Sequence, residues 1–293
     1  MLCIRPIHIK GQKELVPCGQ CCLCREQYAK QWAVRASLEN RLHDKSVFLT
    51  LTYDPLFLPE DGSVHKRVLQ LFLKRLRKYC KCKIRYFACG EYGEQNRRPH
   101  YHLIIYGINR YNPVFYGFLG KSGYCHVWSD PSTGTPYGRV FVGDVTFDSC
   151  KYVAGYIAKK YKGKDALAHY QKLGVEPEFC LQSRRPGIGG AYFDKYQDIV
   201  FNKGFITISG KKYDIPKYFE DKRREFDLQY DFQRKIEVAK SQFEEEQKLR
   251  DLYADRNEYI PGGFNRMQLD ILNQKQANFD ARHKKRKKGA LDV

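Results

Sequence analysis

The sequence of 293 residues lacks any apolar run that could cross a membrane, since none approaches the roughly 18 uninterrupted residues required. It also lacks a long apolar segment behind the N-terminal methionine, so we expect no signal peptide. Acidic residues are few relative to basic ones, 33 against 52. The resulting net charge of +19 makes a polyanion the first partner to consider, nucleic acid before a membrane surface.

Two further patterns are missing. No G-x-x-x-x-G-K-[ST] phosphate-binding loop is present, so we expect no fused helicase, and no internal repeat is visible. The apolar content of 42% can build a sizeable core, and the aromatic content of 14% is too high for a disordered basic protein. Length alone indicates one or two domains.

Positive charge is concentrated in the first two thirds of the chain. Residues 217–258 hold 10 basic and 12 acidic residues, a net of −2, and residues 259–293 hold 8 against 3, a net of +5, which leaves +16 for residues 1–216. We expect four segments: a Cys-rich segment over 1–46, a catalytic domain over 47–216, a long charged helix over 217–260, and a basic, disordered tail over 261–293 that includes HKKRKK (283–288).

Hydrophobic periodicity predicts the main elements of the folded part. Helices are expected over about 25–42, 64–80 and 149–161, and strands over 47–53, 83–92, 100–107 and 138–147, with a Gly- and Tyr-rich insertion before the last strand. After the first helix, the order strand, helix, strand, strand, loop, strand, helix is typical of an α+β fold with an antiparallel sheet.

The stretch RPHYH (98–102) is the most informative in the chain. Side chains alternate along a strand, so His100 and His102 project to one face and Tyr101 to the other. Glu91 ends the preceding predicted strand, and a hairpin would bring it alongside His100. Two neutral imidazoles and a carboxylate suit Mg²⁺ or Mn²⁺ in a site left partly open for a phosphate oxygen. The alternative is that both histidines are polar residues on the solvent face of a hairpin.

A second candidate group lies in the helix predicted over 149–161. Tyr152, Tyr156 and Lys159 are spaced i, i+4, i+7, so they share one helical face. A tyrosine hydroxyl near a metal-held phosphate can act as a nucleophile, and a lysine can stabilise the developing charge or help to position the ion. The alternative is that two aromatics at this spacing only pack against the core.

Three motifs in this order resemble those of the HUH endonucleases, and most closely the rolling-circle replication initiators (Rep) of microviruses of the gokushovirus type. The resemblance covers about residues 1–220. FLTLTYDP (48–55) is similar to the first motif of that family, GEYGEQNRRPHYHLIIYG (90–107) to its metal motif, and YVAGYIAK (152–159) to its two-tyrosine motif. Relaxases of the superfamily place the tyrosine before the histidines, whereas here it follows them.

The resemblance implies the HUH fold, a central antiparallel sheet related to the ferredoxin and RRM arrangements and flanked by helices. It implies that Glu91, His100 and His102 hold the metal, that Tyr152 and Tyr156 attack DNA, and that a lysine assists. Lys160 directly follows Lys159, so which of the two assists stays open.

The implied activity is a site-specific nick at a replication origin, made without ATP. One tyrosine would join the 5′ phosphate and leave a 3′-OH as primer, and the second would cut the regenerated origin so that the released strand is closed into a circle. The expected partners are origin DNA, single-stranded or melted, with a host helicase and polymerase and no membrane, in the cytoplasm of a bacterial host.

Two other functions stay open at this point. A non-enzymatic, zinc-containing single-stranded nucleic-acid-binding protein would explain the charge and the cysteines, but not the ordered His, Glu and Tyr motifs. A plasmid initiator or transposase of the same superfamily is the other alternative. The double tyrosine favours an initiator, and the Cys-rich N-terminus favours the phage group.

The N-terminal cysteines form a second candidate metal site. Cys3, Cys18, Cys21 and Cys24 have the spacing C-x14-C-x2-C-x2-C, which predicts a structural four-thiolate Zn²⁺ site. An iron–sulfur cluster, redox-active thiols and merely packed thiols are the alternatives. The eleven cysteines in all, an odd number without an export signal, are expected to be reduced thiols or metal ligands rather than a disulfide framework.

Basic residues near these motifs are candidate phosphate contacts, which give affinity without sequence information. The alternative is solvated surface charge. The candidates are Arg97, Arg98, Lys160, Arg184 and Arg185.

Overall fold

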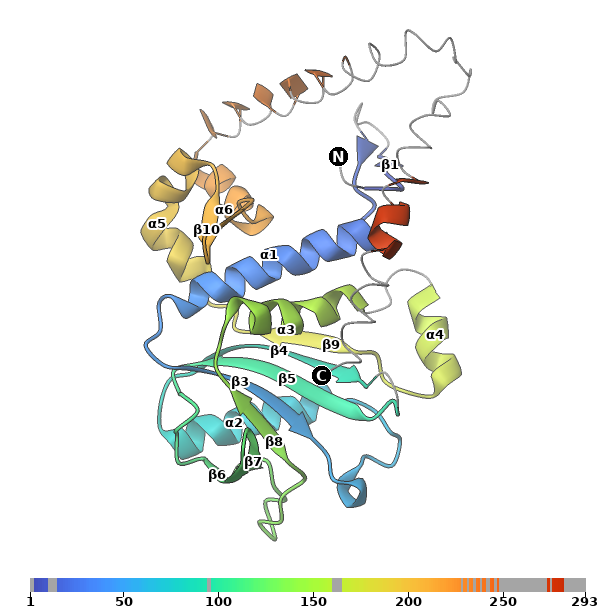
Figure 1. Ribbon diagram of the computed structural model, residues 1–293, viewed down its shortest axis with the longest axis vertical. Coiled ribbons are helices and arrows are strands. Elements are labelled where there is room, and N and C mark those ends of the chain that lie inside the picture. The colour runs from blue at the N-terminus through green and yellow to red at the C-terminus, as the bar shows by residue number, and fades with distance from the viewer. Residues whose placement is uncertain are drawn as a thin grey trace. The chain divides into compact units, whose positions relative to one another are not determined.

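An antiparallel sheet of seven strands forms the centre of residues 26–216, one of two units into which the chain divides. The computed structural model describes residues 3–9, 15–93, 96–159 and 165–227, with isolated positions over 229–247 and 273–281. The sheet order is β6 (Phe115–Leu119), β7 (Ser122–Cys125), β8 (Val140–Gly143), β3 (Ser46–Thr52), β5 (Pro99–Tyr106), β4 (Arg85–Tyr92), β9 (Phe179–Gln182) (Figure 1).

Strand β3 shows why both faces of this sheet are covered. Its sequence SVFLTLT alternates, so Val47, Leu49 and Leu51 point to one side and the residues between them to the other. The first side packs on α2 (Lys66–Cys80), whose buried side chains are Leu69, Phe72, Leu73 and Leu76. Each large apolar side chain buried in this way stabilises the fold by about 1.5–3 kcal/mol.

The opposite face is covered by α1 (Cys22–Asn40) and α3 (Phe147–Lys159) over β4 and β5. On α1, Trp32 stacks on Phe87 of β4 with ring centroids 5.2 Å apart and planes 5° apart. On α3, Val153 and Ala154 are fully buried. The predicted α+β fold, with a central antiparallel sheet flanked by helices, is confirmed.

The expectation of a loop between the strands β5 and β8 is wrong. The Gly- and Tyr-rich insertion forms the hairpin β6–β7, which joins the sheet through β8. Its pairing is irregular between Tyr116 and Leu119, and Gly117 and Gly120 adopt positive φ values of 61° and 64°. Such interrupted strands lack the regular alternation from which strands are predicted.

The strand predicted over 138–147 is shorter than expected, because the last residues of that range begin α3. Thr146 and Ser149 cap this helix reciprocally: the Thr146 N–H donates to Ser149 Oγ at 2.8 Å, and the Ser149 N–H donates to Thr146 Oγ1 at 3.2 Å. Elements that the periodicity did not predict are η1 (Pro55–Phe57), α4 (Asp165–Leu173), β9, α5 (Gly190–Lys203), β10 (Ile206–Ile208) and β11 (Lys211–Tyr213).

The second unit comprises residues 1–25 and 217–293. It contains β1 (Ile7–His8) paired with β2 (Leu15–Val16), the start of α1, and α6 (Lys217–Phe226). The Asp227 N–H donates to the Arg223 carbonyl, and the described positions of 229–247 are helical. Most of the predicted long helix, and the basic run 283–288, lie outside the described residues, so the long helix and the disordered tail stay predictions. Among the described helices, none has the length and apolar character needed to cross a membrane.

A buried carboxylate joins distant elements of residues 26–216. Glu39 on α1 is 1% exposed and accepts hydrogen bonds from the Gly189 N–H at 2.7 Å and from the Arg85 guanidinium, with His43 Nε2 at 3.2 Å. Arg85 also donates to the Pro186 carbonyl at 2.9 Å. Burial raises the pKa of Glu39, but the hydrogen bonds from His43, Arg85 and Gly189 outweigh it and lower this pKa below its ordinary value of 4.5.

We expect Glu39→Gln to destabilise the fold by about 3 kcal/mol at neutral pH, because Arg85 loses its buried counter-charge. Since the folded-state pKa of Glu39 is lowered, the wild-type advantage is fully present above pH 4.5 and shrinks as the pH falls through the folded-state pKa. Urea unfolding of both proteins over a pH series measures this. Glu60→Gln changes an exposed carboxylate and is the control; equal unfolding free energies for both variants would contradict the prediction.

Candidate active site

A cavity of about 810 Å³ opens on the face of the sheet that carries α3. It lies wholly within residues 26–216. Its walls come from β3, β4, β5, β8 and the first turns of α3. The lining residues are Phe48, Thr50, Thr52, Glu91, Gly93, His100, His102, Phe141, Asp148, Ser149, Tyr152 and Tyr156.

Strand register brings Glu91 and the two histidines together. Glu91 on β4 pairs with His100 on β5, and His102 stands two residues further along the same face. His102 is 3% exposed, and its Nε2 lies 2.9 Å from Oε1 of Glu91, which is 6% exposed. The rings of His100 and His102 are nearly parallel, with centroids 6.4 Å apart.

The second ring nitrogen of each histidine also has a partner. His100 Nδ1 lies 2.7 Å from the Arg98 carbonyl oxygen, and His102 Nδ1 lies 2.9 Å from Thr50 Oγ1. Both partners can accept a hydrogen bond, so both favour the tautomer with the proton on Nδ1 and a lone pair on Nε2. Burial lowers the pKa of His100, which keeps that imidazole neutral.

This donor set fits a divalent cation. The two Nε2 atoms and the Glu91 carboxylate face one cavity, and the supporting oxygens prepare the imidazoles as ligands. The three groups are not drawn to coordination distance of one another: among the described residues, only the cysteine group described below brings three or more potential ligand atoms that close. Glu91 and His102 instead contact each other directly.

Tyr152 and Tyr156 of α3 both reach the cavity. The Tyr156 ring stacks on His102 with centroids 4.8 Å apart and planes 1° apart, and the Tyr152 ring meets His102 edge-on at 5.1 Å. The two tyrosine rings are 5.1 Å apart. Tyr152 is 50% exposed and Tyr156 only 8%. Burial, Tyr152 and the charge of Glu91 raise the pKa of Tyr156 well above its ordinary range, so the Tyr156 hydroxyl stays protonated in this environment.

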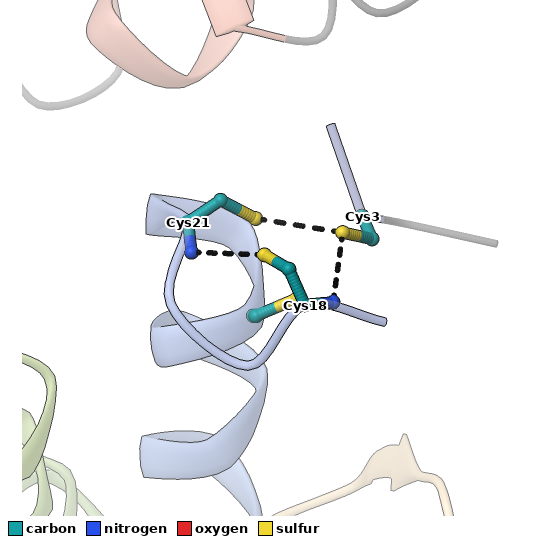
Figure 2. A group of neighbouring side chains, drawn as sticks. Cys3, Cys18 and Cys21 are labelled. Atoms are coloured by element: carbon teal, nitrogen blue, oxygen red, sulfur yellow. Dashed lines mark hydrogen bonds between the residues drawn. The ribbon is translucent and has the colours of Figure 1, made fainter. Parts of the chain in front are cut away.

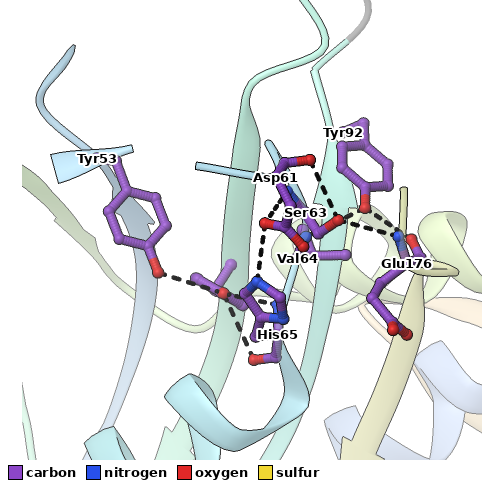
Figure 3. A network of polar contacts seen from close by, with 8 residues as sticks. Tyr53, Asp61, Ser63, Val64, His65, Tyr92 and Glu176 are labelled. Atoms are coloured by element: carbon purple, nitrogen blue, oxygen red, sulfur yellow. Dashed lines mark hydrogen bonds and ion pairs between the residues drawn. The ribbon is translucent and has the colours of Figure 1, made fainter. Parts of the chain in front are cut away.

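The residue between the histidines anchors the strand from the other side. Tyr101 is fully buried, and its hydroxyl accepts from the His65 N–H at 3.1 Å and lies 3.4 Å from the Tyr53 hydroxyl (Figure 3). Nearby, the Tyr92 hydroxyl accepts from the Val64 N–H at 3.1 Å and donates to a main-chain carbonyl at 2.6 Å. These bonds fix the ends of β4 and β5 that carry the cavity residues.

The predicted basic residues lie in different settings. Arg98 donates to the Tyr53 carbonyl at 2.6 Å, so it supports the chain beside β5. Arg97, Arg184 and Arg185 are exposed, and none of the three lines the cavity. Lys159 is the last residue of α3, and the structure does not describe its side chain; Lys160 lies outside the described residues.

Several cavity residues were not singled out from the sequence. Thr50 and Thr52 share the face of the histidines because they alternate with buried leucines in FLTLTY, a signal that the sequence did contain. Phe141 arrives from β8 and Ser149 from the helix cap. Only the tertiary pairing of β8 with β3 places Phe141 there, so no local pattern could identify it.

The unit formed by residues 1–25 and 217–293 contains a separate cysteine cluster (Figure 2). The Sγ atoms of Cys3, Cys18, Cys21 and Cys24 all lie within 4.8 Å of one another. Gly19, with a φ of 70°, allows the tight turn between Cys18 and Cys21. The cluster has the donors and the spacing to bind a metal ion such as zinc.

Main-chain N–H groups point at these sulfurs. The Cys18 N–H lies 3.3 Å from Cys3 Sγ, and the Cys21 N–H lies 3.3 Å from Cys18 Sγ. Burial raises the pKa of the Cys21 thiol, but hydrogen bonds from main-chain N–H groups and neighbouring thiols outweigh it and lower this pKa to about 7. The pKa of Cys24 is raised by burial and by Cys21. The cluster therefore favours one thiolate and disfavours a second.

Comparison with known proteins places these features in a family. Residues 46–161 match the family model of the ORF2-type replication-associated proteins, a range that starts at β3 and includes all of α3. It therefore spans every residue that lines the cavity. No solved structure matches the chain.

Three phage proteins are similar to the chain, each 29% identical. They are the replication-associated proteins VP4 of Bdellovibrio phage phiMH2K (94% of this chain and 97% of the relative), ORF2 of Spiroplasma virus 4 (82% and 87%) and ORF4 of Chlamydia phage 1 (73% and 57%). The fold is consistent with the HUH type. The chain therefore belongs to the family of replication-associated proteins of microvirus-type phages.

Proposed function

We propose that this protein is a site-specific single-strand DNA endonuclease and strand transferase that starts and ends rolling-circle replication of a small circular phage genome. One observation carries the proposal: two tyrosine hydroxyl groups and a Glu–His–His set line one cavity of a strongly basic chain. The names of the phage relatives support a role in replication.

The proposed reaction is a transesterification at phosphorus. A tyrosine Oη attacks the scissile phosphate, the P–O3′ bond breaks, and a P–Oη bond to the 5′ phosphate forms. The tyrosine loses its proton and the leaving 3′ oxygen gains one, so no external energy source is consumed. The free 3′-OH then primes synthesis, and its later attack on a phosphotyrosyl ester rejoins the strand.

The unequal exposure of the two tyrosines supports different roles. Tyr152 is half-exposed and reaches an incoming phosphate without rearrangement, whereas Tyr156 is buried against His102. We assign the first attack to Tyr152 and the second, at the end of the round, to Tyr156. The i, i+4 spacing lets either hydroxyl serve the same phosphate position after a small shift.

Glu91, His100 and His102 are the proposed ligands of Mg²⁺ or Mn²⁺. When bound, the cation supplies Lewis-acid polarisation of the scissile phosphate. Thr50 and the Arg98 carbonyl orient the imidazoles, and Phe48 and Tyr156 cover the inner side of His102. A lysine at the end of α3, Lys159 or Lys160, is proposed to assist.

The proposal predicts the behaviour of the tyrosine variants. With single-stranded oligonucleotides from the cognate genome and Mn²⁺, wild type forms a protein–DNA adduct that EDTA prevents. Tyr152→Phe should lower initial adduct formation at least about tenfold, Tyr156→Phe should lower it less, and the double variant should form none. Denaturing gels measure the rates, and mass spectrometry locates the ester.

The exposed Tyr111→Phe, outside the cavity, is the control and should match wild type. An adduct formed by the double variant would sink the assignment of nucleophiles. Tight DNA binding without an adduct or a cut strand, with any divalent metal, would favour the non-enzymatic binding protein.

The role of Thr50 can be tested by metal binding alone. Thr50→Val removes the oxygen beside His102 Nδ1 and should weaken Mn²⁺ affinity by roughly 10- to 100-fold, as loss of such supporting bonds usually does. Isothermal titration of the full chain measures this. Thr52→Val is the matched control, because the Thr52 hydroxyl donates to the Arg139 carbonyl instead. Equal Mn²⁺ affinities for both variants would refute the role of Thr50.

We propose that the cysteine cluster holds a structural Zn²⁺. Four sulfurs about 2.3 Å from a tetrahedral ion stand about 3.8 Å apart, which is close to the 3.9 Å between Cys3 Sγ and Cys21 Sγ. Main-chain N–H groups directed at the sulfurs stabilise thiolate.

Purified protein should retain about one equivalent of zinc, measured by mass spectrometry of the metal content. Cys21→Ser should lose it. The neighbouring Cys22→Ser should keep it, since the Cys22 thiol hydrogen-bonds to Gln276 and is no member of the cluster. Iron in place of zinc would indicate the alternative cluster, and a metal-free but fully folded wild type would contradict the site.

The remaining partners follow from the proposed reaction. The substrate is origin DNA, single-stranded or melted, and strand separation and synthesis are assigned to a host helicase and polymerase. The exposed Arg97, Arg184 and Arg185 are candidate phosphate contacts. Because the relatives belong to phages, we assign the reaction to the cytoplasm of the bacterial host.

A further inference from the structure

Two rows of side chains cross the sheet from the histidines towards its β6 edge. In the first, His102 pairs with Thr50, Thr50 with Phe141, and Phe141 with Ser122. Paired residues of neighbouring strands point to the same face. The cavity face at His102 therefore continues onto β8 and β7, where Phe141 lines the cavity and is 38% exposed.

The second row starts at His100. His100 pairs with Thr52, and the Thr52 N–H donates to the Arg139 carbonyl at 3.1 Å. The Arg139 guanidinium lies 5.6 Å from the centre of the Tyr124 ring, and Tyr124 pairs with Tyr116 of β6. Together, Tyr116, Tyr124, Arg139 and Phe141 form a band that we call the aromatic strip.

The aromatic strip lies on a part of the sheet that no described helix covers. The cluster that packs α1 and α3 onto this face includes residues of β3, β4 and β5, and in the described part of the chain it includes none of β6, β7 or β8. Figure 1 shows β6 and β7 at the end of the sheet away from α3. Tyr116 is 36% exposed, and Arg139 is exposed as well.

The composition of the aromatic strip suits a single strand of nucleic acid. Aromatic rings stack on unpaired bases whatever their sequence, and an arginine beside them neutralises a phosphate. Lys121 adds an exposed charge in the β6–β7 turn, and residues 1–216 carry a net charge of +16. A folded protein partner would gain less from a band that alternates ring, cation and ring.

We propose that the aromatic strip binds the single-stranded DNA that flanks the scissile phosphate, so that the strand runs from the cavity across β8 and β7 to β6. This deepens the proposed function and rests on it for the identity of the strand. Four strand spacings of about 4.8 Å separate β5 from β6, about 19 Å in all. At about 3.4 Å per nucleotide, this length matches roughly five nucleotides.

The test measures binding without cleavage. The full chain is titrated into a fluorescein-labelled oligothymidine of about 15 nucleotides in EDTA, and anisotropy gives the Kd. Phe141→Leu and Tyr116→Leu keep an apolar side chain but remove the ring, and each should weaken binding roughly 5- to 100-fold. Phe118→Leu is the matched control on the same hairpin: Phe118 packs over Gly123, on the α2 side of the sheet, and is 42% exposed.

A salt series tests the charge independently of ring packing. Arg139→Gln should reduce the slope of log Kd against log salt concentration by about 0.7, the value for one phosphate contact to a single strand. Lys74→Gln, an exposed residue of α2 on the other face, should leave the slope unchanged. Thermal unfolding of each variant verifies that its fold is retained.

The outcomes separate this proposal from the proposed function. If Phe141→Leu, Tyr116→Leu and Arg139→Gln all bind oligothymidine within about twofold of wild type, the aromatic strip is not the DNA path, even where wild type forms the tyrosyl adduct. If they lose affinity while Phe118→Leu does not, the path is established, whether or not an adduct forms.

Discussion

The pairing of β3 with β5 is the constraint on which the rest of the site depends. Its register puts Thr50 opposite His102 and Thr52 opposite His100, and the pleat sends Tyr101 into the core on the other side. A slip of one residue would bury both histidines and expose Tyr101. The buried leucines of β3 and the hydrogen bonds of the Tyr101 hydroxyl oppose that slip, so the packing on the α2 face determines the chemistry on the opposite face.

Burial then tunes the groups that this register collects. Glu91 and His102 are almost fully buried and contact each other, an arrangement that stays favourable because each compensates the polarity of the other. Tyr156 closes the inner side of His102, while Tyr152 stays at the open side. Two hydroxyl groups one helical turn apart thus differ in solvation, and this difference lets identical residues take different steps of one cycle.

Much of this arrangement could be predicted from the sequence, because it rests on local periodicities. The alternation of His100, Tyr101 and His102 and the i, i+4 spacing of the tyrosines each place side chains on a face. The position of Phe141 follows instead from the pairing of β8 with β3, and the hairpin β6–β7 is interrupted by glycines that resemble a loop. The buried role of Glu39 was equally invisible, since its partners Arg85 and Gly189 are distant in sequence.

The uneven covering of the sheet connects stability with the proposed activity. Helices α1 and α3 bury the face over β4 and β5, where the cavity needs rigid walls. The same face over β8, β7 and β6 stays open, although Phe141 and Tyr116 would gain about 1–2 kcal/mol each from full burial. An added helix there would stabilise the domain and close the approach to Tyr152. Leaving aromatic rings in water next to the nucleophile is therefore understandable if a strand of DNA covers them during the reaction.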